Sequence, residues 1–117
     1  ILAAHGNELM AGRGRQLLRF EAAVAGAIPI IQGLSGGLAA NRLGGLFGII
    51  NGTCNYIFGE MEANGTAFDE VLAEAQRLGY AEADPSFDID GIDAAHKLTI
   101  LLAILYGSLF SCPFAYT

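Results

Sequence analysis

The segment from Thr66 to Gly79 constrains the fold of this chain more than any other part of the sequence. Apolar residues recur in it at the spacing of one helix face, namely Phe68, Val71, Leu72, Ala75 and Leu78. The opposite face carries Glu70, Glu74 and Arg77. Thr66 and Asp69 have the spacing of a capping box, and Gly79 suits the position that follows a helix. The sequence therefore predicts an amphipathic helix that ends at Gly79.

Other helices are predicted from their start and stop signals. Pro29 is placed to open a helix that Gly36 and Gly37 end. A helix over residues 53–63 ends at Asn64 and Gly65, and a long helix begins at Gly91. Residues 7–13 are expected to form a short helical turn.

Two segments have the composition of strands. Residues 16–24 contain the run LLRFEAAV, and residues 43–51 (LGGLFGIIN) have the pattern of a buried strand. No repeat or linker separates these segments from the helices. The expected fold class is α+β, with a partial open sheet covered on one face by helices, in one piece.

Composition limits the partners. With 53% hydrophobic and 15% charged residues the chain is expected to fold, and part of its apolar surface is expected to meet another domain or subunit. A net charge of −6 disfavours nucleic acid and anionic membranes. The apolar run 98–110 is too short to span a bilayer, and no signal peptide is expected. Cys54 and Cys112 lack metal-site spacing, which favours reduced thiols and a cytoplasmic location.

An acidic loop precedes the only lysine, Lys97. It holds five of the twelve acidic residues: Glu82, Asp84, Asp88, Asp90 and Asp93. Three interpretations of these acids involve no catalysis: a capping box of Asp90 and Asp93, a surface pair of Asp93 with Lys97, and a calcium loop in DIDGID. Alternatively, the carboxylates bind a substrate ammonium group while Lys97 acts as an acid or base toward a carbonyl or alcohol oxygen. Composition alone leaves these alternatives open.

The strings FEAAVAGAIPII, GLAANRLGGLFGIINGTCNYI and FDEVLAEAQRLGYAEADPSFDIDGIDAAHKL occur in this order. Together they resemble the catalytic domain of homoserine dehydrogenase. The resemblance implies an oxidoreductase that interconverts L-homoserine and L-aspartate 4-semialdehyde with NADP or NAD, in threonine, methionine and isoleucine biosynthesis. It also implies a small-molecule substrate and a homo-oligomer.

The resemblance assigns roles to individual residues. Lys97 is the implied proton donor to the aldehyde oxygen, Glu82 and Asp93 bind substrate, and Asp88 tunes the site. Gly79 lies at a family position whose backbone contacts the cofactor. A monovalent cation, usually sodium, is implied at the backbone carbonyls of Glu21, Val24, Gly26 and Ile28.

The chain also departs from the family pattern. Ala27 replaces a second glycine of the V-x-G-G-I-P turn, and Phe87 replaces an acid found in some members. No GxGxxG loop with a ribose-binding acid is present, so residues 1–117 are expected to be a partial catalytic domain without the nucleotide-binding domain. This chain alone is therefore expected to be inactive. The alternative function is a non-catalytic binding or assembly module that retains the fold.

Overall fold

The computed structural model describes residues 1–11 and 18–107. The chain divides into two compact units, one made of Ile1–Phe47 with Ala95–Thr117 and the other of Gly48–Ala94. Every regular element within the described residues is a helix. None of these helices is long and apolar enough to cross a membrane.

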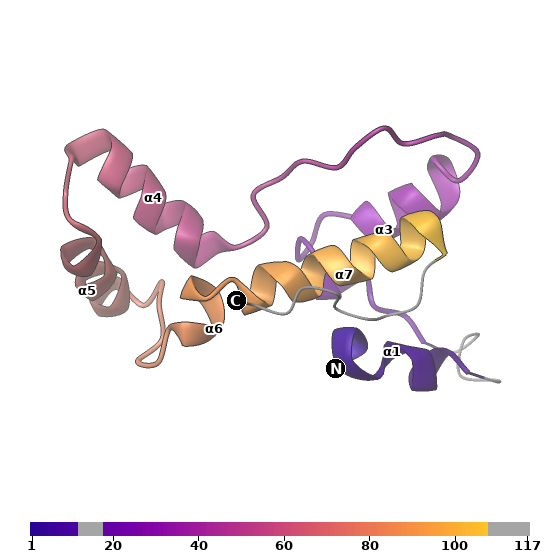
Figure 1. Ribbon diagram of the computed structural model, residues 1–117, viewed down its shortest axis with the longest axis horizontal. Coiled ribbons are helices and arrows are strands. Elements are labelled where there is room, and N and C mark those ends of the chain that lie inside the picture. The colour runs from indigo at the N-terminus through magenta and orange to yellow at the C-terminus, as the bar shows by residue number, and fades with distance from the viewer. Residues whose placement is uncertain (12–17, 108–117) are drawn as a thin grey trace. The chain divides into compact units, whose positions relative to one another are not determined.

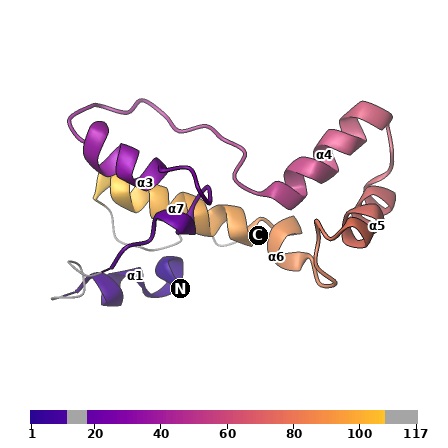
Figure 2. The same cartoon turned by 180° about the vertical axis from the view of Figure 1, so that it is seen from behind.

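The first unit is built around a small apolar core. Its helices are α1 (Leu2–Met10), η1 (Glu21–Ala23), α3 (Ile30–Gln32), η2 (Gly33–Gly37) and the part of α7 (Ile92–Tyr106) from Ala95 onward. α3 lies beside α7 (Figures 1 and 2), and their apolar side chains meet in one cluster. That cluster contains Val24, Ile31, Leu34, Ile100 and Leu101.

The side chain of Glu21 caps the start of α3. Its carboxylate oxygens accept hydrogen bonds from the backbone N–H of Ile31 at 2.8 Å and of Gln32 at 2.9 Å. These N–H groups have no carbonyl partner within the helix, so the carboxylate supplies the missing hydrogen-bond acceptors. Pro29 directly precedes α3 and η2 ends at Gly37, which confirms the predicted boundaries.

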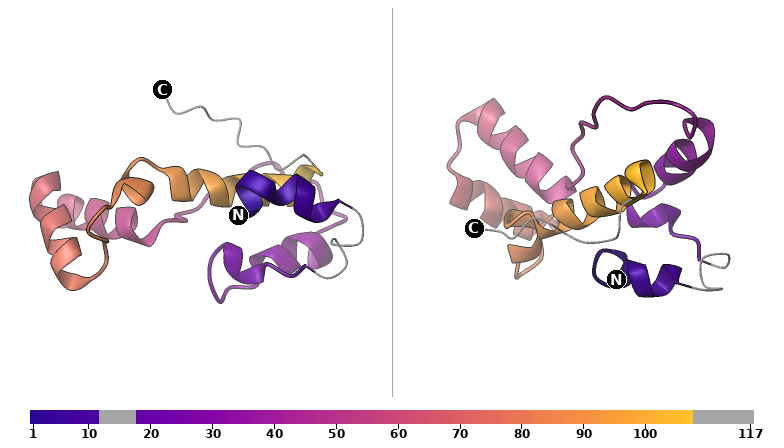
Figure 3. Two further views of the ribbon diagram at one scale, coloured as in Figure 1. Left: turned by 90° about the horizontal axis from the view of Figure 1, so that it is seen from below. Right: turned by 45° about the vertical axis from the view of Figure 1, so that its right-hand side comes forward.

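The second unit contains α4 (Gly52–Asn64), α5 (Phe68–Leu78), α6 (Ser86–Ile89) and the first residues of α7. Figure 3 shows this succession from two further sides. A cluster of Ile57, Val71, Ala75 and Ala81 joins α4, α5 and the loop that follows α5. The predicted apolar face of α5 therefore packs on a core, except that Leu78 at its end is 46% exposed.

Glycine ends both α4 and α5 as predicted. Gly65 has φ 66° and Gly79 has φ 79°, a left-handed conformation that side chains with a Cβ rarely adopt. The predicted capping box of Thr66 and Asp69 is wrong. The helix begins one residue later than a Thr66 cap requires. Its N-cap is therefore Ala67, whose side chain makes no capping hydrogen bond.

The predicted strands are also absent from the described residues. Glu21–Ala23 is a 3₁₀ helix, and no strand forms over residues 43–51; residues 16 and 17 lie outside the described part. A strand needs a neighbouring strand to complete its hydrogen-bond ladder, and the described residues contain no strand. Phe47 is 96% and Ile49 79% exposed, so the apolar pattern there does not mark burial within this chain. α1 begins earlier than the predicted turn over residues 7–13, whose last residues are not described.

Candidate functional site

The acidic loop lies between α5 and α7. Two of its residues bond the short helix α6, Asp84 through its carboxylate and Asp90 through its backbone N–H. Asp84 accepts a hydrogen bond from the backbone N–H of Ser86 at 3.2 Å, at the start of that helix. Hydrogen bonds from the Ser86 hydroxyl and N–H lower the pKa of Asp84. Asp90 follows the last residue of α6, and its N–H donates to the carbonyl of Ser86. α7 begins at Ile92, so Asp90 does not directly precede it as the predicted capping box requires.

Asp88 and Asp93 converge on one amide group. The Nδ2 of Asn51 donates to Oδ1 of Asp88 at 2.7 Å and to Oδ2 of Asp93 at 2.8 Å. Because the same nitrogen donates to both carboxylates, the distance between the two oxygens cannot exceed the sum of the two hydrogen-bond lengths. The structure thus brings together two of the predicted site residues, and these are distinct from the two acids that serve α6.

Asn51 also fixes the start of α4. It is the N-cap of that helix, and its Oδ1 accepts a hydrogen bond from the backbone N–H of Cys54 at 2.8 Å. This bond fixes the orientation of the amide, since its oxygen faces the helix and its two N–H groups face the carboxylates. Sequence reasoning missed Asn51, because the predicted helix began at residue 53, whereas α4 begins at Gly52 and asparagine is a preferred N-cap.

Thr53 connects Asp88 to the loop after α5. Its hydroxyl oxygen lies 2.8 Å from Oδ2 of Asp88 and 2.9 Å from the carbonyl oxygen of Tyr80. Thr53 and Asn51 are each only 8% exposed, so these hydrogen bonds are shielded from water. Both oxygens of Asp88 are therefore engaged, one by Asn51 and the other by Thr53. Thr53 is thereby part of the same network as Asn51 and Asp88.

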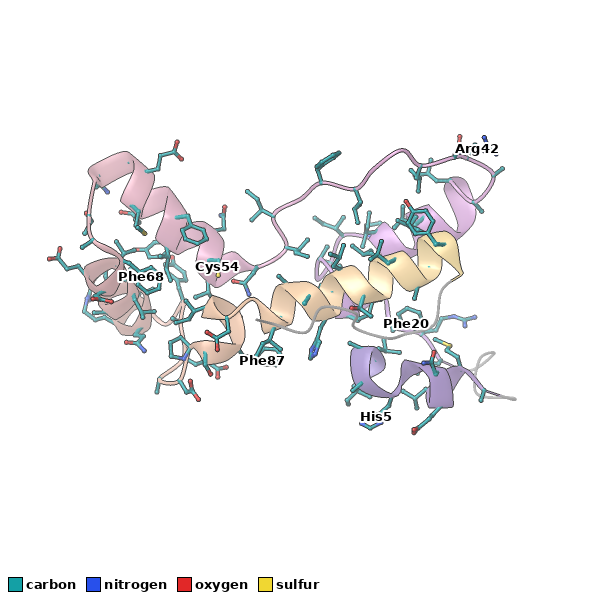
Figure 4. The ribbon with its side chains drawn as sticks, in the orientation of Figure 1. His5, Phe20, Arg42, Cys54, Phe68 and Phe87 are labelled. Atoms are coloured by element: carbon teal, nitrogen blue, oxygen red, sulfur yellow. The ribbon has the colours of Figure 1, made fainter. Side chains whose placement is uncertain are left out.

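The thiol of Cys54 is affected by the charges of the same two carboxylates. Its Sγ lies 3.3 Å from the carbonyl oxygen of Asp88, and Figure 4 shows it at the start of α4. Burial, followed by the negative charges of Asp88 and Asp93, raises the pKa of the thiol. Cys54 therefore stays protonated near neutral pH and is a poor nucleophile. Cys54 is a free cysteine among the described residues, and Cys112 lies outside them.

Glu82 and Gly79 lie on the exposed side of the loop after α5. The backbone carbonyl of Glu82 accepts a hydrogen bond from Nε2 of Gln76 at 3.1 Å, while its side chain is exposed. Tyr80 packs on Tyr56 of α4 with ring centroids 4.8 Å apart, which holds the same loop. At Gly79 no described atom lies within 4 Å of the position of an added Cβ. Its left-handed φ favours glycine, and the residue is exposed.

Lys97 lies on α7 four residues after Asp93. The helix is continuous through both residues, which confirms the condition under which they share a face. Lys97 is half-buried, as is the neighbouring His96. Its role as a proton donor stays a prediction.

The predicted cation residues lie in the first unit, Glu21 in η1 and the other three in the bends and turn that follow it. Ala25 has φ 60° and Gly26 φ 58°, and the carbonyl oxygen of Ile28 accepts the N–H of Ile30 at 2.8 Å. A carbonyl oxygen has two lone pairs, so this bond leaves it able to bind a hard cation. The described residues contain no group of three or more His, Cys, Asp or Glu that would hold a metal ion.

The network should stabilise the second unit measurably. Replacing Thr53 by valine removes the hydroxyl at nearly constant volume and leaves the Tyr80 carbonyl and Asp88 without that partner. We expect the free energy of unfolding to fall by about 1–3 kcal/mol, measured by urea denaturation followed by circular dichroism. Thr66→Val is the matched control, because no hydrogen bond of the Thr66 side chain occurs among the described residues, and it should change stability by less than about 0.5 kcal/mol. Equal effects of the two substitutions would contradict the prediction.

Comparison with known proteins shows which proteins this chain resembles. Residues 29–113 match the family model of homoserine dehydrogenase. The homoserine dehydrogenase of Pseudomonas aeruginosa is 56% identical over 119 residues, covering 100% of this chain and 27% of that protein. That of Neisseria gonorrhoeae is 56% identical over 110 residues, covering 92% of this chain and 25% of that protein.

A solved structure shows the same backbone arrangement. The crystal structure of a homoserine dehydrogenase from Thiobacillus denitrificans aligns with a TM-score of 0.89 and 60% sequence identity. The alignment covers 95% of this chain and 26% of that one. The chain thus spans about a quarter of the length of these relatives.

Proposed function

Because the chain belongs to the homoserine dehydrogenase family, we propose that it forms part of the substrate site of an oxidoreductase that interconverts L-homoserine and L-aspartate 4-semialdehyde. The observation that carries the proposal is the pair of carboxylates held on Asn51, within the segment that matches the family. This reaction supports threonine, methionine and isoleucine biosynthesis, and we place the enzyme in the cytoplasm.

The acidic residues have different roles in this proposal. Asp93 and the exposed Glu82 bind the ammonium group of the amino-acid substrate, since paired opposite charges form strong hydrogen bonds. Asp88 has both oxygens engaged by Asn51 and Thr53, which suits it to shaping the local charge. Its role is to tune the site while Asp93 and Glu82 hold the ligand.

Lys97 donates a proton to the aldehyde oxygen during reduction and accepts it back during oxidation. An ammonium group is a donor with three N–H bonds, so it can bond the oxygen on which negative charge develops. The nicotinamide of NADP or NAD supplies the hydride when bound. The open space beside Gly79 fits close approach of this cofactor to the backbone.

Three further features belong to the proposal for the whole enzyme. A monovalent cation such as sodium binds the carbonyls of Glu21, Val24, Gly26 and Ile28, which are the neutral oxygen ligands that such ions accept. Residues 43–51 pair with other strands to form an open sheet, which gives their exposed apolar side chains a place to bury. The enzyme forms a homo-oligomer.

The experiment is a chimera in which this chain replaces the matching segment of the full-length Pseudomonas aeruginosa relative. NADPH oxidation with aspartate semialdehyde should proceed in the chimera and be absent for this chain alone. Calorimetric titration of this chain alone with NADPH should show no micromolar binding, because it contains no glycine-rich phosphate loop. A folded chimera that binds NADPH without turning over the substrate would instead favour a non-catalytic binding or assembly module.

A further inference from the structure

We infer that Asn51 is a positioning residue that holds the carboxylate of Asp93, which binds the substrate ammonium group, in a fixed geometry against the carboxylate of Asp88. The inference rests on the proposed function, because the chemistry of the two acids comes from it. Asn51 would act through them and would not itself contact the reacting atoms.

The argument begins with repulsion between like charges. Two carboxylates brought close together repel, and the repulsion grows in a site shielded from water. Asn51 is 8% exposed and places one N–H of its amide on each carboxylate, at 2.7 and 2.8 Å. The amide thereby offsets part of the repulsion and fixes the separation of the two acids before any ligand arrives.

The geometry of the amide is itself fixed by the backbone. Oδ1 of Asn51 accepts the N–H of Cys54 at the start of α4, so both amide N–H groups remain directed to Asp88 and Asp93. A rigid helix end therefore sets the position of two side chains that come from α6 and α7. Preorganised acceptors lose less entropy when they bind a ligand.

The chemistry of asparagine, serine and aspartate allows a graded test. All three are good N-cap residues, so the cap of α4 is retained in each case. The number of side-chain hydrogens that can be donated falls from two in asparagine to one in serine and none in ionised aspartate. Any property that depends on the donors should follow this order, whereas a property that depends only on the cap should not.

We would measure steady-state kinetics of Asn51→Ser and Asn51→Asp in the Pseudomonas chimera. kcat/KM for aspartate semialdehyde should fall about threefold for serine and about tenfold or more for aspartate, as expected for one and two weakened hydrogen bonds. KM for NADPH should stay unchanged, because the cofactor does not depend on these carboxylates. Asn64→Asp is the matched control, since Asn64 bonds Glu60 at the far end of the same helix, and it should leave all constants unchanged.

Several outcomes would overturn the inference. Equal kcat/KM in the parent, serine and aspartate chimeras would show that the donors do not position the acids. A parallel loss of NADPH affinity would show general disruption of the fold. If Asn51→Asp does not fold, the serine variant alone must show the smaller loss. A parent chimera that neither binds homoserine nor turns over would refute the proposed function and this inference with it, whereas an active parent with unaffected variants refutes only the inference.

Discussion

Replacing Lys97 by alanine in the Pseudomonas chimera is expected to lower kcat by about 100- to 10,000-fold, the range typical of a lost general acid. The physical reason is that hydride addition leaves negative charge on the aldehyde oxygen, and alanine has no proton to give. KM for NADPH should change little, because the lysine acts on the substrate oxygen. The measurement is steady-state NADPH oxidation with aspartate semialdehyde.

Lys97→Arg provides the control for charge. Arginine keeps the positive charge but does not release a proton at accessible pH, so most of the loss should persist. Full recovery of turnover by arginine would mean that Lys97 contributes charge alone. Near-normal turnover in Lys97→Ala would contradict the proposed mechanism altogether.

Replacing Glu82 by alanine should act mainly on substrate binding. We expect KM for aspartate semialdehyde to rise by about 10- to 100-fold, because a charge-assisted hydrogen bond to the ammonium group is lost in the ground and transition states alike. The side chain is exposed, and the backbone carbonyl that bonds Gln76 is retained, so the melting temperature should not change. Kinetics and thermal denaturation of the same chimera give both quantities.

Glu62→Ala is the matched control for that prediction. Glu62 is an exposed glutamate on α4, and its removal changes the net charge by the same amount. It should leave KM unchanged. An equal rise in KM for the two variants would indicate a general electrostatic attraction of the substrate and would contradict a specific contact at Glu82.

The helices α3, α4, α5 and α7 were predictable from sequence because their signals are local, whereas η1 lies in a predicted strand and α6 was not predicted. The periodic apolar face predicted α5, and the glycines after α4 and α5 predicted helix ends that the structure confirms. The strands were not, because a strand depends on a distant partner that periodicity does not reveal. Residues 43–51 have the composition of a strand, yet they form none within the described part of the chain. The capping box failed for a smaller reason, since helix starts shift by a residue at little cost.

The site was predictable in part. The acidic loop marked Asp88 and Asp93, and the structure separates them from Asp84 and Asp90, which serve α6. Nothing in the loop itself pointed to Asn51, which is 37 residues away from Asp88 along the chain. A hydrogen bond over that separation follows from tertiary packing, and only the helix-start position of Asn51 gave a local hint.

The hydroxyl of Thr53 has a single hydrogen, so the acceptor of its hydrogen bond can change. Two acceptors lie within reach of it, the Tyr80 carbonyl at 2.9 Å and Asp88 at 2.8 Å, and it can point fully toward only one of them at a time. When a cation arrives beside the carboxylates, the Asp88 oxygen needs this donor less, and the hydrogen can turn to Tyr80. Rotation about one C–O bond thus moves a hydrogen-bond donor from one acceptor to the other while every backbone atom stays in place.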